Sequence, residues 1–202
     1  VGADQRLLVT VGRLAPQKGL DLLCDAASLL GSTAPTSSTA PLAPTAPTPP
    51  LPPTAPLAPT IVWVVAGDGP LRDEVQGRVD REALPVRLLG RREDVADLMA
   101  AADVVVSTAR WEGQPLGVQE ALALGAAVVA TDVGGTREVT GDAAVLVEPD
   151  AHALAQALAS LLRDDARREQ LRAVARERAS QLPTIEDTMD QLTAVWGAAA
   201  GR

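Results

Sequence analysis

Short apolar runs alternate with stretches of helical periodicity along most of this chain. The runs are continuously apolar, which is typical of strands buried on both faces of a parallel sheet. Strands are predicted over residues 6–11, 61–66, 86–89, 103–107, 127–131 and 143–147. The stretches between them place apolar residues at helical spacing, so helices are expected to connect the strands. The first such helix has one apolar face, formed by Leu20, Leu23, Cys24, Ala27 and Leu30.

Strands that alternate with helices through short glycine-bearing turns predict an α/β fold. The expected architecture is a doubly wound, Rossmann-like parallel sheet of about six strands. Three further helices follow the last strand, beginning with stripes at Leu154, Leu171 and Ile185. We therefore expect residues 1–202 to form one domain. A strand almost at the first residue suggests a domain cut from a larger protein.

Residues 32–60 contain only Ala, Pro, Thr, Ser and Leu and carry no charge. This composition is unsuited to a helix or a buried core, so the stretch is predicted to be an extended or disordered surface insertion within the domain. A proline-rich arm that binds a partner is the alternative. Because loop closure costs little for long loops, a tolerated expansion is the preferred interpretation.

Composition narrows the classes of function. The formal net charge of -8 argues against nucleic acid as a partner, because phosphate backbones select basic surfaces. Cys24 is the only cysteine, so no internal disulfide is possible, and we expect it in the core. His152, the only histidine, is expected on the surface or at a helix cap. No signal peptide or membrane-spanning run is seen, which predicts a soluble, cytoplasmic protein.

Two glutamates, Glu112 and Glu120, stand eight positions apart around a Gly-Gln-Pro turn. Glu112 follows a predicted strand, at the sheet edge where open α/β folds bind ligands. Glu120 lies just over one turn inside a helix predicted for residues 116–124, and the free backbone donors around Leu116 and Gly117 favour an anion. Together these groups suit a ligand with hydroxyls at both ends and phosphates between them, as in a nucleotide-sugar.

The loop at residues 12–19 supplies candidate cations. It follows the first strand and opens the first helix, as phosphate-binding loops do. Lys18 is the only lysine in the chain, where every other fixed positive side chain is arginine. One explanation is that its compact ammonium charge binds a phosphate group. A solvated surface loop is the alternative, but the position at a strand end favours phosphate binding. Lys18 is expected to have no buried partner.

Three motifs stand in a fixed order along the chain. They are Val11-Gly12-Arg13-Leu14 with Gln17-Lys18-Gly19, Ala66-Gly67-Asp68-Gly69-Pro70, and Glu112 to Glu120 followed by Ala121-Leu122-Ala123-Leu124-Gly125. In this order the chain resembles the donor-nucleotide domain of the retaining glycosyltransferases of family 4, one half of the GT-B fold. The resemblance runs from about Arg6 to Trp196, interrupted by the insertion.

The resemblance implies a catalytic role for Arg13, Lys18 and Glu112. Arg13 and Lys18 would clamp the donor diphosphate and carry charge as the leaving group departs. Glu112 would meet hydroxyls of the transferred sugar and need not be a nucleophile, because the diphosphate itself can assist attack by the acceptor. The implied reaction is hexosyl transfer from a UDP-, GDP- or ADP-sugar, without a cofactor or a metal ion.

The remaining implied contacts concern the donor's other groups. Glu120 would accept hydrogen bonds from the ribose, and the donors at Leu116 and Gly117 would hold phosphate or sugar oxygens. Arg91 follows a strand near the place of the base. Many relatives have Glu-Gly-Phe-Gly-Leu where this chain has Glu112-Gly113-Gln114-Pro115-Leu116, and Pro115 removes one backbone donor.

The implied partner is an amino-terminal acceptor domain that this sequence lacks. The final helix would cross back to that domain and therefore expose apolar residues. On this interpretation the fragment alone is inactive. Peripheral association of the full-length protein with a membrane is compatible with the same interpretation. Two alternatives stay open: a nucleotide-sugar epimerase of similar fold, and a non-catalytic subunit that binds nucleotide-sugars.

Overall fold

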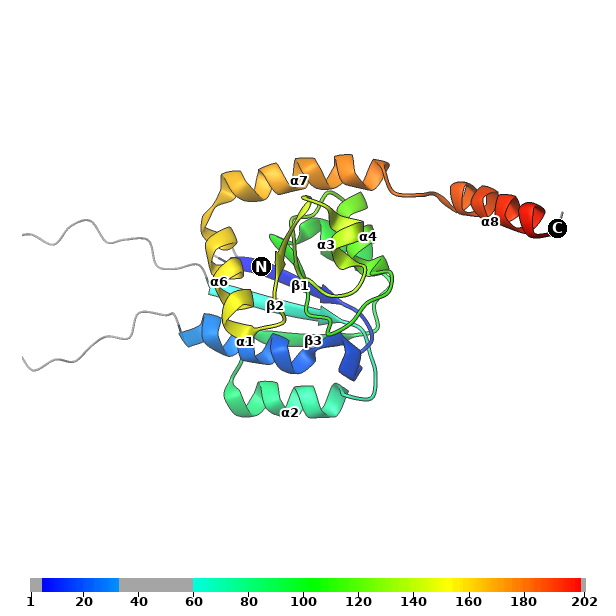
Figure 1. Cartoon of the computed structure of the whole chain (residues 1–202). Coiled ribbons are helices and arrows are strands. Elements are labelled where there is room, and N and C mark those ends of the chain that lie inside the picture. Colours follow the sequence, from blue (N-terminus) through cyan, green and yellow to red (C-terminus); the bar gives the residue numbers. More distant parts are fainter. Residues whose placement is uncertain (1–4, 33–59, 201–202) are drawn as a thin grey trace, which may run out of the picture.

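The structure is a computed structural model that describes residues 5–32 and 60–200. The described residues form one six-stranded parallel sheet in the order β3-β2-β1-β4-β5-β6, which confirms the predicted fold class (Figure 1). The strands are β1 Gln5–Val11, β2 Thr60–Ala66, β3 Val86–Gly90, β4 Val104–Ser107, β5 Val128–Thr131 and β6 Ala144–Val147. The order reverses between β1 and β4, and in such sheets ligands bind beside the carboxyl ends of those two strands.

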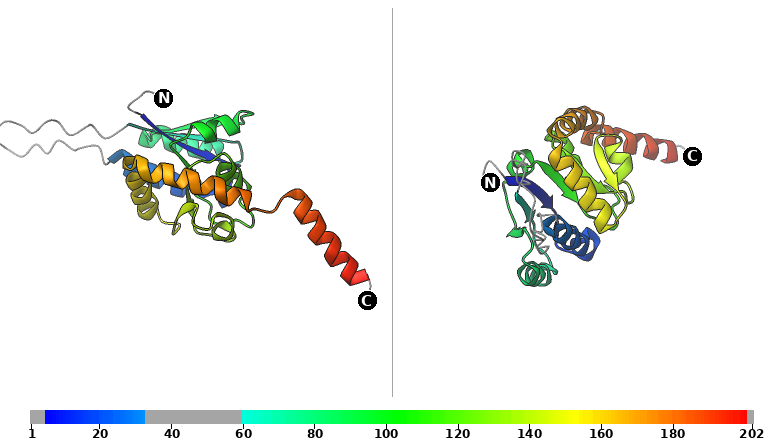
Figure 2. Two further views of the ribbon diagram at one scale, coloured as in Figure 1. Left: turned by 90° about the horizontal axis from the view of Figure 1, so that it is seen from above. Right: turned by 90° about the vertical axis from the view of Figure 1, so that its left-hand side faces the viewer.

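Helices cover both faces of the sheet (Figures 1 and 2). The helices α1, α2 and α6 pack on one face and α3, α4 and α5 on the other, while α7 contributes Leu171 to the first core and Ala175 to the second. Their bounds are α1 Leu20–Ser32, α2 Arg72–Glu82, α3 Val95–Ala101, α4 Leu116–Ala123, α5 Thr136–Thr140, α6 Ala151–Arg163 and α7 Asp165–Ser180, with a single 3-10 turn, η1, at Pro16–Lys18. The four central strands, β1, β2, β4 and β5, are thus largely buried on both sides, which explains their apolar sequences.

Side chains of each strand alternate between the two cores. In β1, Leu8 faces the core under α1 and α6, while Val9 faces the core under α4. Trp63 of β2 is fully buried, and its indole Nε1–H donates to Thr10 Oγ1 at 3.0 Å. The Thr10 hydroxyl in turn donates to Val106 O at 2.9 Å. These two hydrogen bonds join β2, β1 and β4 and satisfy the polar atoms of the buried indole and hydroxyl.

Cys24 lies in the core, as predicted, and burial raises the pKa of its thiol to about 11. At about pH 8 only about one thiol in a thousand would be ionised, and the thiolate is the reactive form. We expect iodoacetamide to alkylate the native protein at least about 100-fold more slowly than the protein unfolded in guanidinium chloride. Mass spectrometry of timed samples measures both rates. Equal rates would place the thiol outside the core.

The regular elements on either side of the insertion reach slightly further than predicted, because Ser32 belongs to α1 and Thr60 to β2. The predicted insertion otherwise lies outside the described residues. Replacing residues 34–58 with a short Gly-Ser linker is expected to leave the melting temperature within a few degrees, because loop closure changes by only about 0.6 kcal/mol per doubling of length. Calorimetry of the two proteins tests this. Loss of the cooperative transition would show that the insertion packs against the domain.

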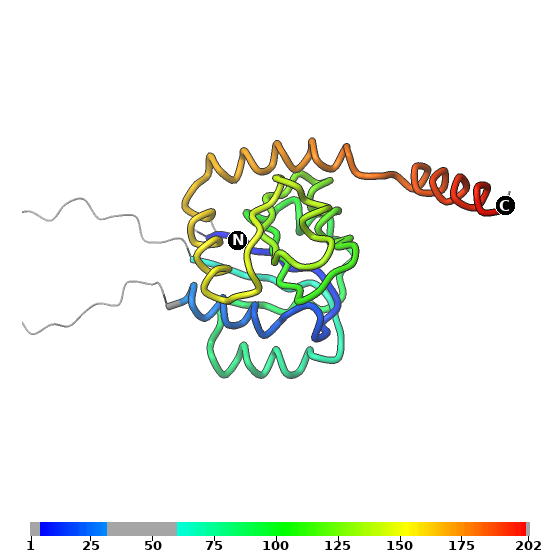
Figure 3. Tube along the Cα trace, in the orientation of Figure 1, coloured from blue at the N-terminus to red at the C-terminus, as the bar shows by residue number. Residues whose placement is uncertain are grey.

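The last helix, α8 (Ile185–Ala200), extends away from the sheet and its covering helices (Figures 1 and 3). Its large apolar side chains are exposed, as the resemblance implied; they are Ile185, Met189, Leu192, Val195 and Trp196. Among the described residues no helix is both long and apolar enough to cross a membrane.

Candidate functional site

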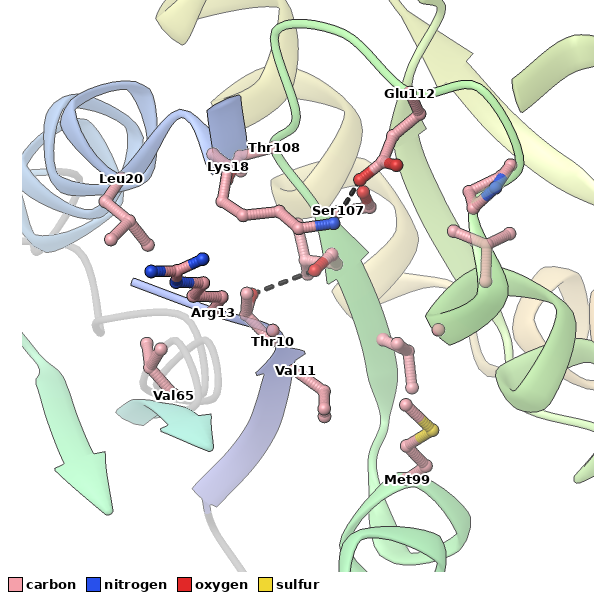
Figure 4. A pocket seen from close by; sticks show the side chains of 16 residues that line it. Thr10, Val11, Arg13, Lys18, Leu20, Val65, Met99, Ser107, Thr108 and Glu112 are labelled. Carbon is pink, nitrogen blue, oxygen red and sulfur yellow. Dashed lines mark hydrogen bonds and ion pairs between the residues drawn. The ribbon is translucent and has the colours of Figure 1, made fainter. Parts of the chain in front are cut away.

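An open pocket lies at the carboxyl ends of β1 and β4 (Figure 4). Arg13, Lys18, Glu112 and Gly117 all line it, although they come from two separate segments of the chain, one after β1 and one after β4. The switch point of the sheet brings those segments together, because adjacent parallel strands end at the same edge. The structure therefore unites most of the predicted site in one place.

Arg13 is exposed at the pocket, and its guanidinium has no ion pair or hydrogen bond with the described residues. Its backbone, in contrast, is closely held. Leu14 N donates to Asp68 O at 3.0 Å, and Gly12 N donates to Ala66 O at 3.0 Å. The Gly67-Asp68-Gly69 motif thus supports the loop that carries Arg13.

The glycines of this motif allow that close support. Gly67 has a φ of +151°, and a Cβ there would lie 1.8 Å from Gly12 O. A Cβ at Gly69 would lie 2.5 Å from Leu14 O. Both distances are far below van der Waals contact, so only glycine lets the two loops meet. The motif acts on the pocket through the backbone next to Arg13.

Lys18 forms an ion pair with Glu112, and Figure 4 shows the ammonium group directed at that carboxylate. The Glu112 side chain is only 10% exposed and that of Lys18 27% exposed. The expectation that Lys18 has no buried partner was therefore wrong. The physical reason is that the partner stands 94 residues away in sequence and reaches Lys18 only through the adjacency of β1 and β4. Of the two cations at the pocket, only Arg13 then has no partner within the part of the chain that the structure describes.

Glu112 is held from the opposite side by the turn after β5. Gly135 N donates to Glu112 O at 3.0 Å. Gly134 has a φ of +51°, and a Cβ there would lie 1.9 Å from the same carbonyl oxygen. The sequence showed Gly134-Gly135 only as the end of a strand, and nothing in it linked this turn to Glu112.

The start of α4 differs from the prediction at Leu116. Its N–H donates to Gln114 O at 2.9 Å, so this donor is not free. Pro115 between them has φ -77° and ψ 80°, which is an inverse γ-turn that uses the Leu116 N–H locally. The Leu116 side chain is 62% exposed. Gly117 lines the pocket and, within the described residues, its N–H has no hydrogen-bond acceptor, so this donor stays available to an anion.

Glu120 and Arg91 do not line this pocket. Glu120 lies three residues after Gly117 on α4, so it occupies the same helix face about one turn further from the pocket. It is exposed. Arg91 is exposed and directly follows β3, the edge strand two places from β1. Either residue could meet only the part of a long ligand that extends beyond the pocket.

Among the described residues, no group of three or more His, Cys, Asp or Glu side chains is arranged to hold a metal ion. His152 is exposed in the first turn of α6, where Asp150 caps the helix by accepting from Ala153 N at 2.9 Å. The predicted surface position of this histidine is thus confirmed.

A parallel sheet in this order, with a pocket at its switch point, defines a Rossmann-like α/β domain. The chain belongs to the glycosyl transferases group 1 family, glycosyltransferase family 4, whose model matches residues 2–178. The described fold corresponds to one half of the GT-B architecture of these enzymes.

Similar proteins include a teichuronic acid biosynthesis glycosyltransferase of Bacillus subtilis, 33% identical over 77% of this chain and 32% of the relative. The D-inositol 3-phosphate glycosyltransferase of Jonesia denitrificans is 33% identical over 94% of this chain and 42% of its own. The chain thus spans less than half the length of these relatives.

Solved structures show the same relation. The sucrose-phosphate synthase of Thermosynechococcus elongatus matches with a TM-score of 0.76 and 27% identity, over 98% of this chain and 47% of that one. The Anabaena protein HepE, in complex with UDP and glucose, matches with a TM-score of 0.76 and 24% identity, over 97% and 49% of the two chains.

Proposed function

We propose that this chain is the donor-binding half of a retaining glycosyltransferase that moves a hexosyl group from a nucleoside diphosphate sugar to an acceptor. The observation that carries the proposal is the meeting of Arg13, Lys18, Glu112 and the Gly117 amide in one pocket at the switch point. Two cations and a free amide suit a diphosphate, and the carboxylate suits sugar hydroxyls. The relative crystallised with UDP and glucose supports the same ligand class.

In the proposed reaction, the bond between the anomeric carbon and the diphosphate oxygen breaks, and its electron pair leaves with the nucleoside diphosphate. The acceptor hydroxyl oxygen bonds to the same face of that carbon, and its proton passes to the departing diphosphate oxygen. Arg13 and Lys18 stabilise the charge that develops on this leaving group, so no metal ion is needed. Glu112 orients the sugar through its hydroxyls.

Two further contacts complete the proposal. Glu120 meets the ribose and Arg91 the base side of a donor that extends from the pocket along α4 and toward β3. The acceptor is bound by a separate amino-terminal domain, against which α8 packs in the full-length protein. We place the full-length protein in the cytoplasm, where peripheral association with a membrane is compatible with its proposed reaction.

Calorimetric titration of residues 1–202 with UDP-, GDP- and ADP-glucose tests donor binding, and a radiolabelled-sugar transfer assay tests catalysis. We expect weak binding of one donor and no transfer, because the acceptor cannot be held against the sugar. Absence of binding for all three donors and their diphosphates would contradict the proposal. Robust transfer by these residues alone would show that a second domain is not required.

The non-catalytic subunit is the second candidate, and the exposed apolar face of α8 favours it equally, because that face fits a separate partner chain. A full-length chain that transfers sugar without another protein would exclude it. The epimerase alternative has no support in the pocket: among the described lining residues, Glu112 is the only carboxylate, and no histidine lies there.

A further inference from the structure

Residues 108–113, here called the β4–α4 segment, run between the loop that carries Lys18 and the turn after β5. On the first side, Thr108 Oγ1 donates to Lys18 O at 2.8 Å, and Arg110 N donates to Gln17 O at 2.8 Å. In the described part of the chain no second donor reaches Lys18 O. Thr108 is only 2% exposed, so loss of its hydroxyl would leave this carbonyl unpaired beside a buried side chain.

Backbone packing strengthens the same contact. Gly19 has a φ of +59°, and a Cβ there would lie 2.0 Å from Thr108 O. Arg110 also pairs with Asp21 in the first turn of α1. Burial alone would raise the pKa of Asp21, but the hydrogen bond from Arg110 lowers it below its ordinary value.

The segment is held on its second side by the strand and turn that follow α4. Thr131 Oγ1 donates to Ala109 O at 2.5 Å, and Gly135 N donates to Glu112 O at 3.0 Å. Gly134 approaches Glu112 O so closely that any side chain there would displace the carbonyl. Both ends of the segment are therefore fixed by backbone contacts.

Lys18 is consequently restrained at two points by one segment. Thr108 holds its carbonyl, and Glu112, four residues later, pairs with its ammonium group. In a nucleoside diphosphate sugar, the diphosphate and the sugar are joined by the bond that breaks in the proposed reaction. The cation for the first and the carboxylate for the second must therefore keep a fixed separation, and small errors in such geometry reduce rates strongly.

We propose that Thr108 and Gly134 are positioning residues, which act through Lys18 and Glu112 respectively. Thr108 sets the place of the phosphate-binding cation, and Gly134 sets the place of the sugar-binding carboxylate. The inference rests on the proposed function and deepens it, because it assigns the two halves of the pocket to two different supports.

The first test replaces the Thr108 hydroxyl with a methyl group of similar shape. Thr108→Val is expected to weaken the binding of UDP and of inorganic pyrophosphate by about 3- to 10-fold, which corresponds to the loss of one hydrogen bond. The affinity for uridine should not change. Thr108→Ser keeps the hydroxyl and should restore affinity. Thr140→Val is the matched control, because Thr140 is also buried and its hydroxyl also donates to a backbone carbonyl, that of Thr136.

A readout without ligand is available because Lys18 is the only lysine. Acetylation by an N-hydroxysuccinimide ester, followed by peptide mass spectrometry, reports its accessibility separately from the terminal amine. We expect Lys18 to react faster in Thr108→Val than in the wild type, Thr108→Ser or Thr140→Val. A uniform loss of stability in Thr108→Val and Thr140→Val would not produce this difference.

The second test concerns Gly134. Gly134→Ala is expected to shrink the advantage of UDP-glucose over UDP by about 10-fold, because the sugar-binding carboxylate is displaced. Pyrophosphate should bind no more weakly than to the wild type, because the displaced carboxylate competes less for Lys18. Gly141→Ala is its control: Gly141 also has a positive φ, of +50°, but a Cβ there would have no atom closer than 3.7 Å. Circular dichroism establishes that each variant is folded, and if Gly134→Ala is not, the Thr108 pair still decides the role of Thr108. If a folded Gly134→Ala keeps the wild-type advantage of UDP-glucose over UDP, the role assigned to Gly134 is wrong.

The outcomes separate this inference from the proposed function. If Lys18→Ala loses UDP affinity in the same titration while Thr108→Val retains both affinity and the wild-type acetylation rate, the inference is wrong and the proposed function stands. If the wild type binds neither UDP, UDP-glucose nor pyrophosphate, both are wrong. If Thr108→Val loses uridine and UDP equally, its role is structural and the inference is likewise wrong.

Discussion

Replacing Lys18 with alanine is expected to weaken the binding of a nucleoside diphosphate by about 10- to 100-fold. Lys18 lines the pocket from the loop that follows β1. A charge-assisted hydrogen bond from its ammonium group to a phosphate contributes roughly 1.5–3 kcal/mol. The affinity for the nucleoside, which has no phosphate, should hardly change. Calorimetric titration of UDP, GDP and their nucleosides measures both.

The structure adds a second consequence that the sequence did not suggest. Glu112 is partly buried and pairs with Lys18, so the variant leaves this carboxylate without its cation. A loss of stability of about 1 kcal/mol is expected, which is more than a solvated loop lysine would give. Arg13→Ala should match the loss of diphosphate affinity without this cost, because the Arg13 guanidinium has no protein partner among the described residues.

A matched control excludes a general effect of charge. Arg163→Ala changes the net charge equally, but Arg163 is exposed at the end of α6 and does not line the pocket. It should leave UDP affinity within about 2-fold of the wild type, since exposed charges beyond the Debye length are screened. If Lys18→Ala changed UDP affinity as little as Arg163→Ala, Lys18 would not be a diphosphate-binding residue.

The alternation of strands and helices could be predicted from the sequence because the four central strands, β1, β2, β4 and β5, are largely buried on both faces. Apolar runs such as Val104, Val105 and Val106 are required by that burial, and they leave little choice of fold class. The carboxyl ends of β1 and β4 then had to carry the ligand-binding loops, whatever their sequences. That geometry is why Arg13, Lys18, Glu112 and Gly117 were found in one pocket.

What could not be predicted depends on contacts between distant loops. The pairing of Lys18 with Glu112 needs two strands to be adjacent, and local patterns do not carry that information. Leu116 was misjudged for a local reason: the fixed φ of Pro115 makes a γ-turn that consumes the donor. The role proposed for Gly134 could not be predicted either, because it depends on close contact with the carbonyl of Glu112 on another loop.

Replacing Glu112 with glutamine is expected to strengthen the binding of UDP and to reduce the advantage of UDP-glucose over UDP. Glu112 pairs with the ammonium group of Lys18, so a diphosphate that binds this lysine must compete with the carboxylate and also meets its negative charge. Glutamine has a similar shape but no charge. We therefore expect UDP to bind about 3- to 30-fold more tightly to Glu112→Gln, as a modest net change in charge–charge interaction near the surface allows.

The sugar should respond in the reverse direction, because a carboxylate accepts stronger hydrogen bonds from hydroxyls than an amide does. Whatever advantage UDP-glucose has over UDP in the wild type should shrink by about 10-fold in the variant. The measurement is the ratio of the two affinities, which is independent of any small difference in protein stability.

Glu120→Gln is the comparison that makes the Glu112 result decisive. It removes the same charge from α4, about one helical turn beyond Gly117, where the proposal places the ribose. Because uridine, UDP and UDP-glucose share that ribose, all three should lose affinity together, and no ligand should gain. A gain in UDP affinity confined to Glu112→Gln would show that this carboxylate competes with the diphosphate for Lys18. A loss of UDP affinity in Glu112→Gln would instead mean that the carboxylate only holds the lysine in place.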